Sequence, residues 1–117
     1  MADRIGRGQI RLCEFPAPDK TRPVLVLTRP KLIGLLATVV VAPITSTIRG
    51  VPTEVSLSID DGMKVPCCVN LANLYTIHKV LLGRLVGTLS VRRMDEVCRA
   101  ACFSLGCTHE AEDVRSR

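Results

Sequence analysis

A long run without any charged side chain, residues 32–48, constrains the fold of this chain more than any other part of the sequence. The run is almost long enough to be a membrane-spanning helix, which needs about 20 apolar residues. Its centre, however, is Thr38 followed by three valines, and Pro43 comes soon after. Side chains branched at Cβ favour strands, and a proline inside the run disfavours a continuous helix. We therefore expect a buried strand at 37–45 and no membrane span, with Pro43 at a bulge or a locally unpaired edge.

The rest of the chain up to residue 89 is typical of further short strands. Alternating or continuous apolar runs predict strands at 8–15, 22–28, 52–59, 63–70 and 80–89. The sequence Asp60-Asp61-Gly62 predicts a turn between the third and fourth of these. The segment 71–77 is ambiguous and is compatible with a short helical turn.

The last part of the chain predicts one helix. Ser90 is a suitable N-cap, and Gly106 suits the position that follows a helix end. Between them, Met94, Val97, Ala101 and Leu105 are spaced to form one apolar stripe. Short strands followed by a single helix predict a mainly β (α+β) fold, a small and strongly bent barrel capped by that helix. The 117 residues suit a single domain with frayed ends at 1–6 and 108–117.

The charge balance favours a polyanionic partner such as nucleic acid. The formal net charge is +5 and the pI is about 9.1. The chain holds two phenylalanines, one tyrosine and no tryptophan. Proteins that grip single strands mainly by stacking carry more aromatic rings, so binding here has to depend on charge and hydrogen bonds.

The six cysteines do not follow the spacing of a zinc site. The polar and basic residues 1–11 do not resemble a secretory signal, so we expect reduced, mostly buried thiols in a cytoplasmic protein. Cys107 is the one that we expect to be most exposed. We expect neither a metal nor a cofactor.

A candidate phosphate site follows from pairing the second and third expected strands. If Thr28 lies opposite Val39, an antiparallel register also brings Arg22 opposite Thr45. A guanidinium and neighbouring hydroxyls suit the oxygens of a phosphate, and RNA supplies its own nucleophile, the 2′-OH. An arginine at a strand start is also commonly a solvated charge, and Thr-Ser-Thr is commonly a turn, so the residues alone leave both interpretations open.

Several strings, in order along the chain, resemble the MazF/PemK-type toxins. They are the KTRPVLVL of 20–27, the VVVAPITS of 39–46, the PTEV of 52–55, the GQI of 8–10, and the GTLS and MDEV of 87–90 and 94–97. The resemblance implies an SH3-like barrel of the CcdB/PemK type that forms a homodimer. It also implies a metal-independent, sequence-specific endoribonuclease of a type II toxin–antitoxin system, which cuts single-stranded RNA to 2′,3′-cyclic phosphate and 5′-OH ends and so inhibits translation. A cognate antitoxin with an acidic tail in the RNA groove is its implied partner.

The resemblance also implies roles for individual residues. Arg22 matches the catalytic arginine, an acid/base group and phosphorane stabiliser, and Thr45 matches the catalytic threonine, a hydrogen-bond donor to the phosphate. Ser46 and Thr47 follow as RNA contacts, and Arg49 is a candidate for the basic groove.

The chain departs from the family pattern at the groups that would move protons and read bases. Asp19 and Lys20 stand where acidic and glycine residues are usual, and Tyr75 and His78 replace a basic residue and an acid. We count all four as candidate RNA contacts. Tyr75 is either a stacking ring or a half-buried one, and His78 is either a titrating group or a plain surface histidine.

Two other functions remain open on the same barrel. One is a CcdB-like toxin without enzymatic activity that poisons DNA gyrase by protein contact, and the other is an inactive RNA-binding member.

Overall fold

The computed structural model describes residues 4–15 and 21–107. Within these ranges the strands are β1 (Gln9–Glu14), β2 (Thr21–Val26), β3 (Thr38–Thr45), β4 (Glu54–Leu57), β5 (Cys67–Asn70), β6 (Tyr75–His78) and β7 (Leu82–Thr88). The helices are α1 (Pro30–Ile33) and α2 (Val91–Leu105), and two single 3-10 turns are η1 (Ile59–Asp61) and η2 (Lys79–Leu81). Asp19 and Lys20 lie outside the described residues. Of the two ends that we expected to be frayed, residues 1–3 and 108–117 also lie outside them.

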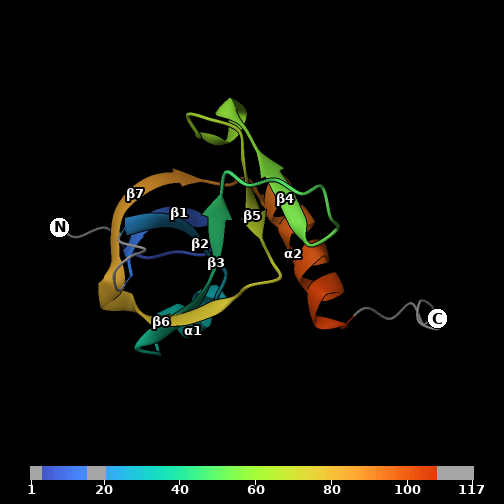
Figure 1. Cartoon of the computed structure of the whole chain (residues 1–117). Coiled ribbons are helices and arrows are strands. Elements are labelled where there is room, and N and C mark those ends of the chain that lie inside the picture. The colour runs from blue at the N-terminus through green and yellow to red at the C-terminus, as the bar shows by residue number, and fades with distance from the viewer. Residues whose placement is uncertain (1–3, 16–20, 108–117) are drawn as a thin grey trace.

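The strands form one antiparallel sheet in the order β4-β5-β3-β2-β1-β7, and β6 pairs with β3 as well. Along one edge of β3, residues 38–41 pair with β6 and residues 44–45 pair with β5. Pro43 falls between these two ladders, so the expected unpaired edge at this proline is confirmed. The change of partner bends the sheet into a small, incompletely closed barrel, and α2 lies beside β4 and β5 (Figure 1). The predicted fold class is therefore confirmed.

Two buried clusters explain why β2 and β3 are apolar on both faces. The first, which we call the α2 core, lies under the C-terminal helix and comprises Ile10, Leu25, Ala42, Ile44, Val55, Leu57, Cys67, Val69, Leu71, Leu89, Met94, Val97 and Ala100. The second, the β6 core, comprises Cys13, Val24, Val26, Ile33, Val39, Val41 and Ile77. Successive side chains of a strand alternate between faces, so the two central strands feed both cores. The sequence shows this as unbroken apolar runs.

Helix α2 begins and ends where the sequence predicts. The Ser90 hydroxyl accepts a hydrogen bond from the Arg93 N–H (3.2 Å), and Gly106 ends the helix with φ of 73°. Met94 and Val97 are buried as expected, but the helix buries Ala100 rather than Leu105, which is 66% exposed. The predicted stripe is present, since Val97, Ala101 and Leu105 line one groove, but it is exposed in the last turn, where the C-terminal end of α2 extends beyond β4 (Figure 1).

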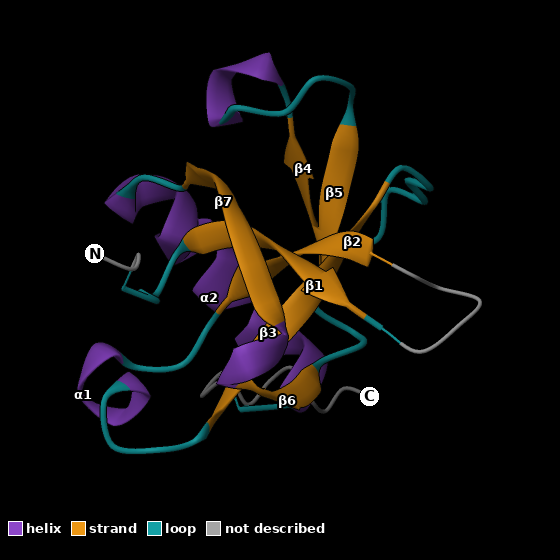
Figure 2. Cartoon of the chain, turned by 90° about the vertical axis from the view of Figure 1, so that its left-hand side faces the viewer, coloured by secondary structure: helices purple, strands orange, loops and turns teal. Residues whose placement is uncertain are grey.

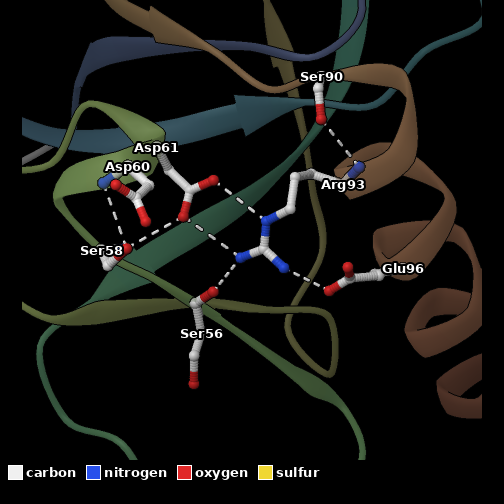
Figure 3. A network of polar contacts seen from close by, with 7 residues as sticks. All are labelled: Ser56, Ser58, Asp60, Asp61, Ser90, Arg93 and Glu96. Atoms are coloured by element: carbon white, nitrogen blue, oxygen red, sulfur yellow. Dashed lines mark hydrogen bonds and ion pairs between the residues drawn. The ribbon is translucent and has the colours of Figure 1, made fainter.

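Arg93 ties the start of α2 to the turn after β4 (Figure 3). Its Nε donates to Asp61 Oδ1 (3.1 Å), and a second guanidinium nitrogen donates to Asp61 Oδ2 (3.3 Å). The guanidinium also donates to the Ser56 carbonyl and to the Glu96 carboxylate. Asp61 in turn accepts from the Ser58 N–H (3.0 Å), which closes a capping box around η1. One side chain thus joins a strand, a turn and a helix.

One strand and one α-helix were not predicted. Residues 75–78 form β6, in a segment that the sequence left ambiguous, because a turn after Asn70 lets the chain return alongside β3; the Asn70 side chain accepts from the Ala72 N–H (3.0 Å). Helix α1 is too short for a periodic pattern, and Pro30 at its first turn is its only local signal. Figure 2 shows α1 at the periphery, in the connection between β2 and β3.

Residues 4–6, at the start of the described chain, are held by hydrogen bonds from β1. The Gly6 N–H donates to the Gln9 side chain (2.9 Å), and the Arg4 carbonyl accepts from Gln9 and Arg11. None of the described helices is long and apolar enough to cross a membrane.

Candidate active site

The candidate site lies at one end of the barrel. There, polar side chains continue the rows of apolar side chains that β2 and β3 contribute to the β6 core. Val24 pairs with Pro43 and Val26 with Val41, which is the register predicted from the sequence. Two residues further along the same alternation, Arg22 continues the row of Val24, and Thr45 continues the row of Pro43. The apolar rows therefore end in a guanidinium and a hydroxyl on the same face.

These groups share one pocket of about 280 Å³. Its lining comprises Phe15, Arg22, Pro43, Thr45, Thr47, Arg49, Asn70, Asn73 and Tyr75. The lining carries two arginines and, among the described residues, no acidic side chain. Such a pocket favours an anion.

The Thr45 hydroxyl is oriented by a backbone N–H group two residues further along the chain. Its Oγ1 accepts a hydrogen bond from the Thr47 N–H (3.1 Å), and the side chain is half-buried. A hydroxyl that accepts in this way keeps its own hydrogen for another acceptor. Thr45 can therefore donate to a phosphate oxygen in the pocket.

The Arg22 guanidinium is exposed and makes no hydrogen bond or ion pair with another residue in 4–15 or 21–107. In the antiparallel pairing of β1 with β2, Arg22 lies opposite Cys13. Burial, with a smaller effect of Glu14, raises the pKa of the Cys13 thiol, so this neighbour is uncharged at neutral pH. None of the described residues therefore neutralises the positive charge that Arg22 brings to the pocket.

Glu54 fixes the loop that carries Arg49 to the pocket. Its Oε1 accepts from the backbone N–H groups of Arg49 (3.0 Å) and Gly50 (2.9 Å). Gly50 has φ of 74°, in the left-handed region that suits glycine. Glu54 is therefore a positioning residue for Arg49, and the sequence analysis did not assign it this role.

An aromatic pair forms another part of the pocket wall. The rings of Phe15 and Tyr75 lie 5.6 Å apart between centroids and are tilted by 56°. The Asn73 side chain donates to the Tyr75 hydroxyl (3.0 Å). Tyr75 is 39% exposed, so part of the residue is packed and part faces solvent. Phe15 and Asn73 were missed in the sequence, where only the scarcity of aromatic residues draws attention to Phe15.

The structure brings together most, but not all, of the residues predicted for the site. Ser46 and His78 do not line the pocket. His78 pairs with Thr38 at the far end of β6, and it lies three residues from Tyr75, on the opposite face of the strand. An RNA contact by either residue remains a prediction.

In residues 4–15 and 21–107, no three His, Cys, Asp or Glu side chains gather closely enough to hold a metal ion.

Comparison with known proteins decides the family. Residues 6–105 match the family described as the PemK-like, MazF-like toxin of type II toxin–antitoxin systems. The chain belongs to this family. It is 34% identical over 102 residues to a protein named probable endoribonuclease MazF2 from Mycobacterium tuberculosis. The aligned region covers 86% of this chain and 98% of that protein.

Solved structures of MazF toxins show the same fold. The Mycobacterium tuberculosis toxin MazF-mt6 superposes with a TM-score of 0.77 at 36% identity, over 84% of this chain and 96% of the other. An endoribonuclease in complex with its cognate antitoxin, from a mycobacterial species, superposes with a TM-score of 0.78 at 27% identity, over 87% and 95%. The MazF-like fold thus accounts for nearly the whole described chain.

Proposed function

We propose that this MazF-like toxin is a metal-independent endoribonuclease, and that it cuts single-stranded RNA by attack of the substrate's own 2′-OH on the adjacent phosphate. The observation that carries the proposal is the shared pocket of Arg22 and Thr45, in which a guanidinium and a donating hydroxyl meet without an acidic neighbour in the described lining. Two of the relatives given above are named endoribonucleases, which supports the same activity, and none of the three is named as a gyrase inhibitor. The gyrase-poisoning alternative is therefore not favoured.

The chemistry needs only groups that this pocket offers. The 2′-OH loses its proton to water as its oxygen forms a bond to phosphorus, the bond from phosphorus to the 5′-oxygen breaks, and the 5′-oxygen takes up a proton, so that a 2′,3′-cyclic phosphate and a 5′-OH result. Arg22 stabilises the additional negative charge of the pentavalent phosphorane, and Thr45 donates to a non-bridging oxygen. Neither a carboxylate nor an imidazole belongs to the described lining, so we assign proton transfer toward the leaving 5′-oxygen to Arg22.

The remaining lining residues suit the nucleotides next to the cut. Thr47 and Arg49 hold the backbone by hydrogen bonding and charge, and Tyr75 offers a ring on which a base can stack. An unpaired strand exposes the faces of its bases to such a ring, whereas a duplex does not. This arrangement favours a single-stranded substrate.

Incubation of the purified toxin with RNA in EDTA, followed by mapping of the ends, tests this function. We expect cleavage that survives the chelator and leaves 2′,3′-cyclic phosphate and 5′-OH ends. Cleavage that requires a divalent cation, or that leaves 5′-phosphate ends, would rule out 2′-OH attack. Inhibition of gyrase by a toxin that leaves RNA intact would favour the CcdB-like alternative.

The partner that we propose for this toxin is an antitoxin with an acidic segment. The pocket that binds phosphate also suits carboxylates, because Arg22 and Arg49 both face it. An RNA substrate and such an antitoxin place the toxin's action in the cytoplasm. The test is inhibition of RNA cleavage by an acidic peptide. An inhibition constant that is higher for Arg49→Ala than for the wild-type toxin supports this assignment. An inhibition constant that Arg49→Ala leaves unchanged contradicts it.

We also propose a homodimer. A groove of about 380 Å³ lies between α1, β3 and α2 and is lined mainly by aliphatic side chains. Leu32, Leu36 and Leu105 line it while remaining 41%, 45% and 66% exposed. Contiguous exposed apolar surface of this kind commonly marks a protein interface, and a second copy of the chain is the partner that the family resemblance implies.

A further inference from the structure

The end of helix α2 has a hydrogen-bond pattern that brings two side chains together. The Cys107 N–H donates to the Cys102 carbonyl (3.0 Å), and the Gly106 N–H donates to the Phe103 carbonyl (3.3 Å). With Gly106 in the left-handed conformation, these two bonds define a Schellman motif. In this motif the residue after the glycine folds back over the residue five positions earlier, and their side chains are commonly in contact.

In this chain both of those positions are cysteines. The Sγ of Cys107 lies 3.6 Å from the Cys102 carbonyl oxygen, and neither thiol is in a disulfide. Cys107 is exposed and Cys102 is half-buried, whereas Cys13, Cys67 and Cys68 are buried. The motif therefore holds an accessible pair of thiols at the end of α2.

We propose that Cys102 and Cys107 are a reversible redox pair, which hydroperoxides oxidise to a disulfide within the chain. The backbone hydrogen bond from Cys107 to Cys102 and the 3.6 Å contact of the Cys107 sulfur hold the two residues close together, which a disulfide within the chain requires. The other exposed thiol, Cys98, lies one helical turn before Cys102, where the Arg7 guanidinium donates to its sulfur (2.8 Å). Cys98 has a different partner and is a natural control.

The oxidation balances with one peroxide. The Cys107 thiolate attacks a peroxide oxygen and breaks the O–O bond, which gives a sulfenic acid and, after protonation, water. The Cys102 sulfur then attacks the Cys107 sulfur, the S–S bond forms, and a second water leaves. Two thiols and one hydrogen peroxide thus yield one disulfide and two waters, and a thiol reductant reverses the change.

The surroundings of the two sulfurs suggest their order of reaction. A hydrogen bond between the two side chains, with smaller effects of burial and of Cys107 and Cys98, raises the pKa of the Cys102 thiol. Cys102 therefore keeps its proton to a higher pH. The more exposed Cys107 is the sulfur that meets peroxide first, and Cys102 resolves the sulfenic acid.

Trypsin makes the product directly measurable. Cleavage after Arg99 and Arg115 releases the peptide 100–115, which contains Cys102 and Cys107 and no other cysteine. After stoichiometric hydrogen peroxide and alkylation of the remaining thiols, we expect this peptide to have lost two hydrogens and to carry no alkyl group. Reduction before alkylation should restore two alkylated cysteines.

Three variants separate this pair from general oxidation. Cys102→Ser and Cys107→Ser should each abolish the loss of two hydrogens, whereas Cys98→Ser should leave its rate unchanged. Gly106→Ala should slow closure severalfold, because a side chain disfavours the left-handed conformation that the motif needs. Circular dichroism shows whether each variant remains folded.

The outcomes are distinct. A disulfide between 102 and 107 that depends on Gly106 supports the redox pair. A disulfide from Cys98 to Cys102, linkage only between chains, or sulfinic acid as the first product overturns it. The test does not use RNA cleavage, so it is independent of the proposed nuclease activity.

Discussion

At the scale of single residues, Thr45 tests whether a hydroxyl in the pocket acts on the phosphate. Thr45→Val keeps the size and the β-branching of the side chain but removes the donor. We expect the cleavage rate to fall about a hundredfold, as is usual when one hydrogen-bond donor to a developing oxyanion is lost. Single-turnover cleavage of a labelled RNA measures the effect.

Thr76→Val is the matched control, because Thr76 is an exposed threonine of β6 that does not line the pocket. Equal rates for the wild type and Thr45→Val would remove Thr45 from the mechanism.

Tyr75 tests the stacking role. Tyr75→Phe keeps the ring and loses only the contact with Asn73, whereas Tyr75→Ala loses the ring. We expect Tyr75→Ala to weaken binding of single-stranded RNA by about 1–3 kcal/mol, and Tyr75→Phe to change it little. Fluorescence anisotropy with an RNA that carries a 2′-deoxy residue at the mapped cleavage site measures binding without cleavage. Equal weakening by both substitutions contradicts stacking and points to the hydroxyl.

At the scale of secondary-structure elements, the Arg93 network should contribute clearly to stability. Arg93→Ala leaves Asp61, whose side chain is 10% exposed, without its guanidinium partner. We expect a loss of about 1–3 kcal/mol in the free energy of unfolding. Urea denaturation measures this loss.

Arg92→Ala is the control, because Arg92 is an exposed arginine in the same turn of α2. We expect its effect to stay within about 0.5 kcal/mol. A loss of that small size for Arg93→Ala would mean that the network adds nothing to stability.

The elements that the sequence predicts well are those with a local physical signature. Helix α2 has a serine cap and a terminal glycine, and β3 has a run of β-branched residues. The strand β6 was missed because its pairing with β3 depends on a contact between segments that are distant in the sequence. The spacing of Leu105 predicts which face of α2 it shares with Val97 and Ala101, but not that this residue is 66% exposed, because spacing does not report where the neighbouring strands end.

The pocket was predictable only in part, because some of its residues come together through contacts between segments that are distant in the sequence. Arg22 and Thr45 follow from the register of two neighbouring strands, which the sequence predicts. Asn73 joins them through the return of the chain into β6, which the sequence does not predict, and Phe15 joins them from the end of β1. Glu54 acts through backbone N–H groups of a loop, a type of contact without a pattern in the sequence.

At the scale of the whole molecule, the apolar groove should determine the oligomeric state. Leu105→Glu places a charge on this exposed groove residue without disturbing either buried core. We expect light scattering at micromolar concentration to give a dimer mass for the wild type and a monomer mass for Leu105→Glu, with unchanged circular dichroism. Val80→Glu is the control, because Val80 is 88% exposed and lies outside the groove.

A monomeric wild type would contradict the proposed homodimer. A dimeric Leu105→Glu variant would place the interface on another face.

The central claim is that the pocket at the end of the β6 core is the catalytic site, and Arg22 tests it most directly. Single-turnover RNA cleavage in EDTA is compared for the wild type, for Arg22→Ala and for Arg84→Ala, an exposed arginine of β7 that does not line the pocket. We predict that Arg22→Ala lowers the rate by at least about a hundredfold, while the protein stays folded and Arg84→Ala keeps the wild-type rate. A folded Arg22→Ala toxin that cuts RNA at the wild-type rate would contradict the account.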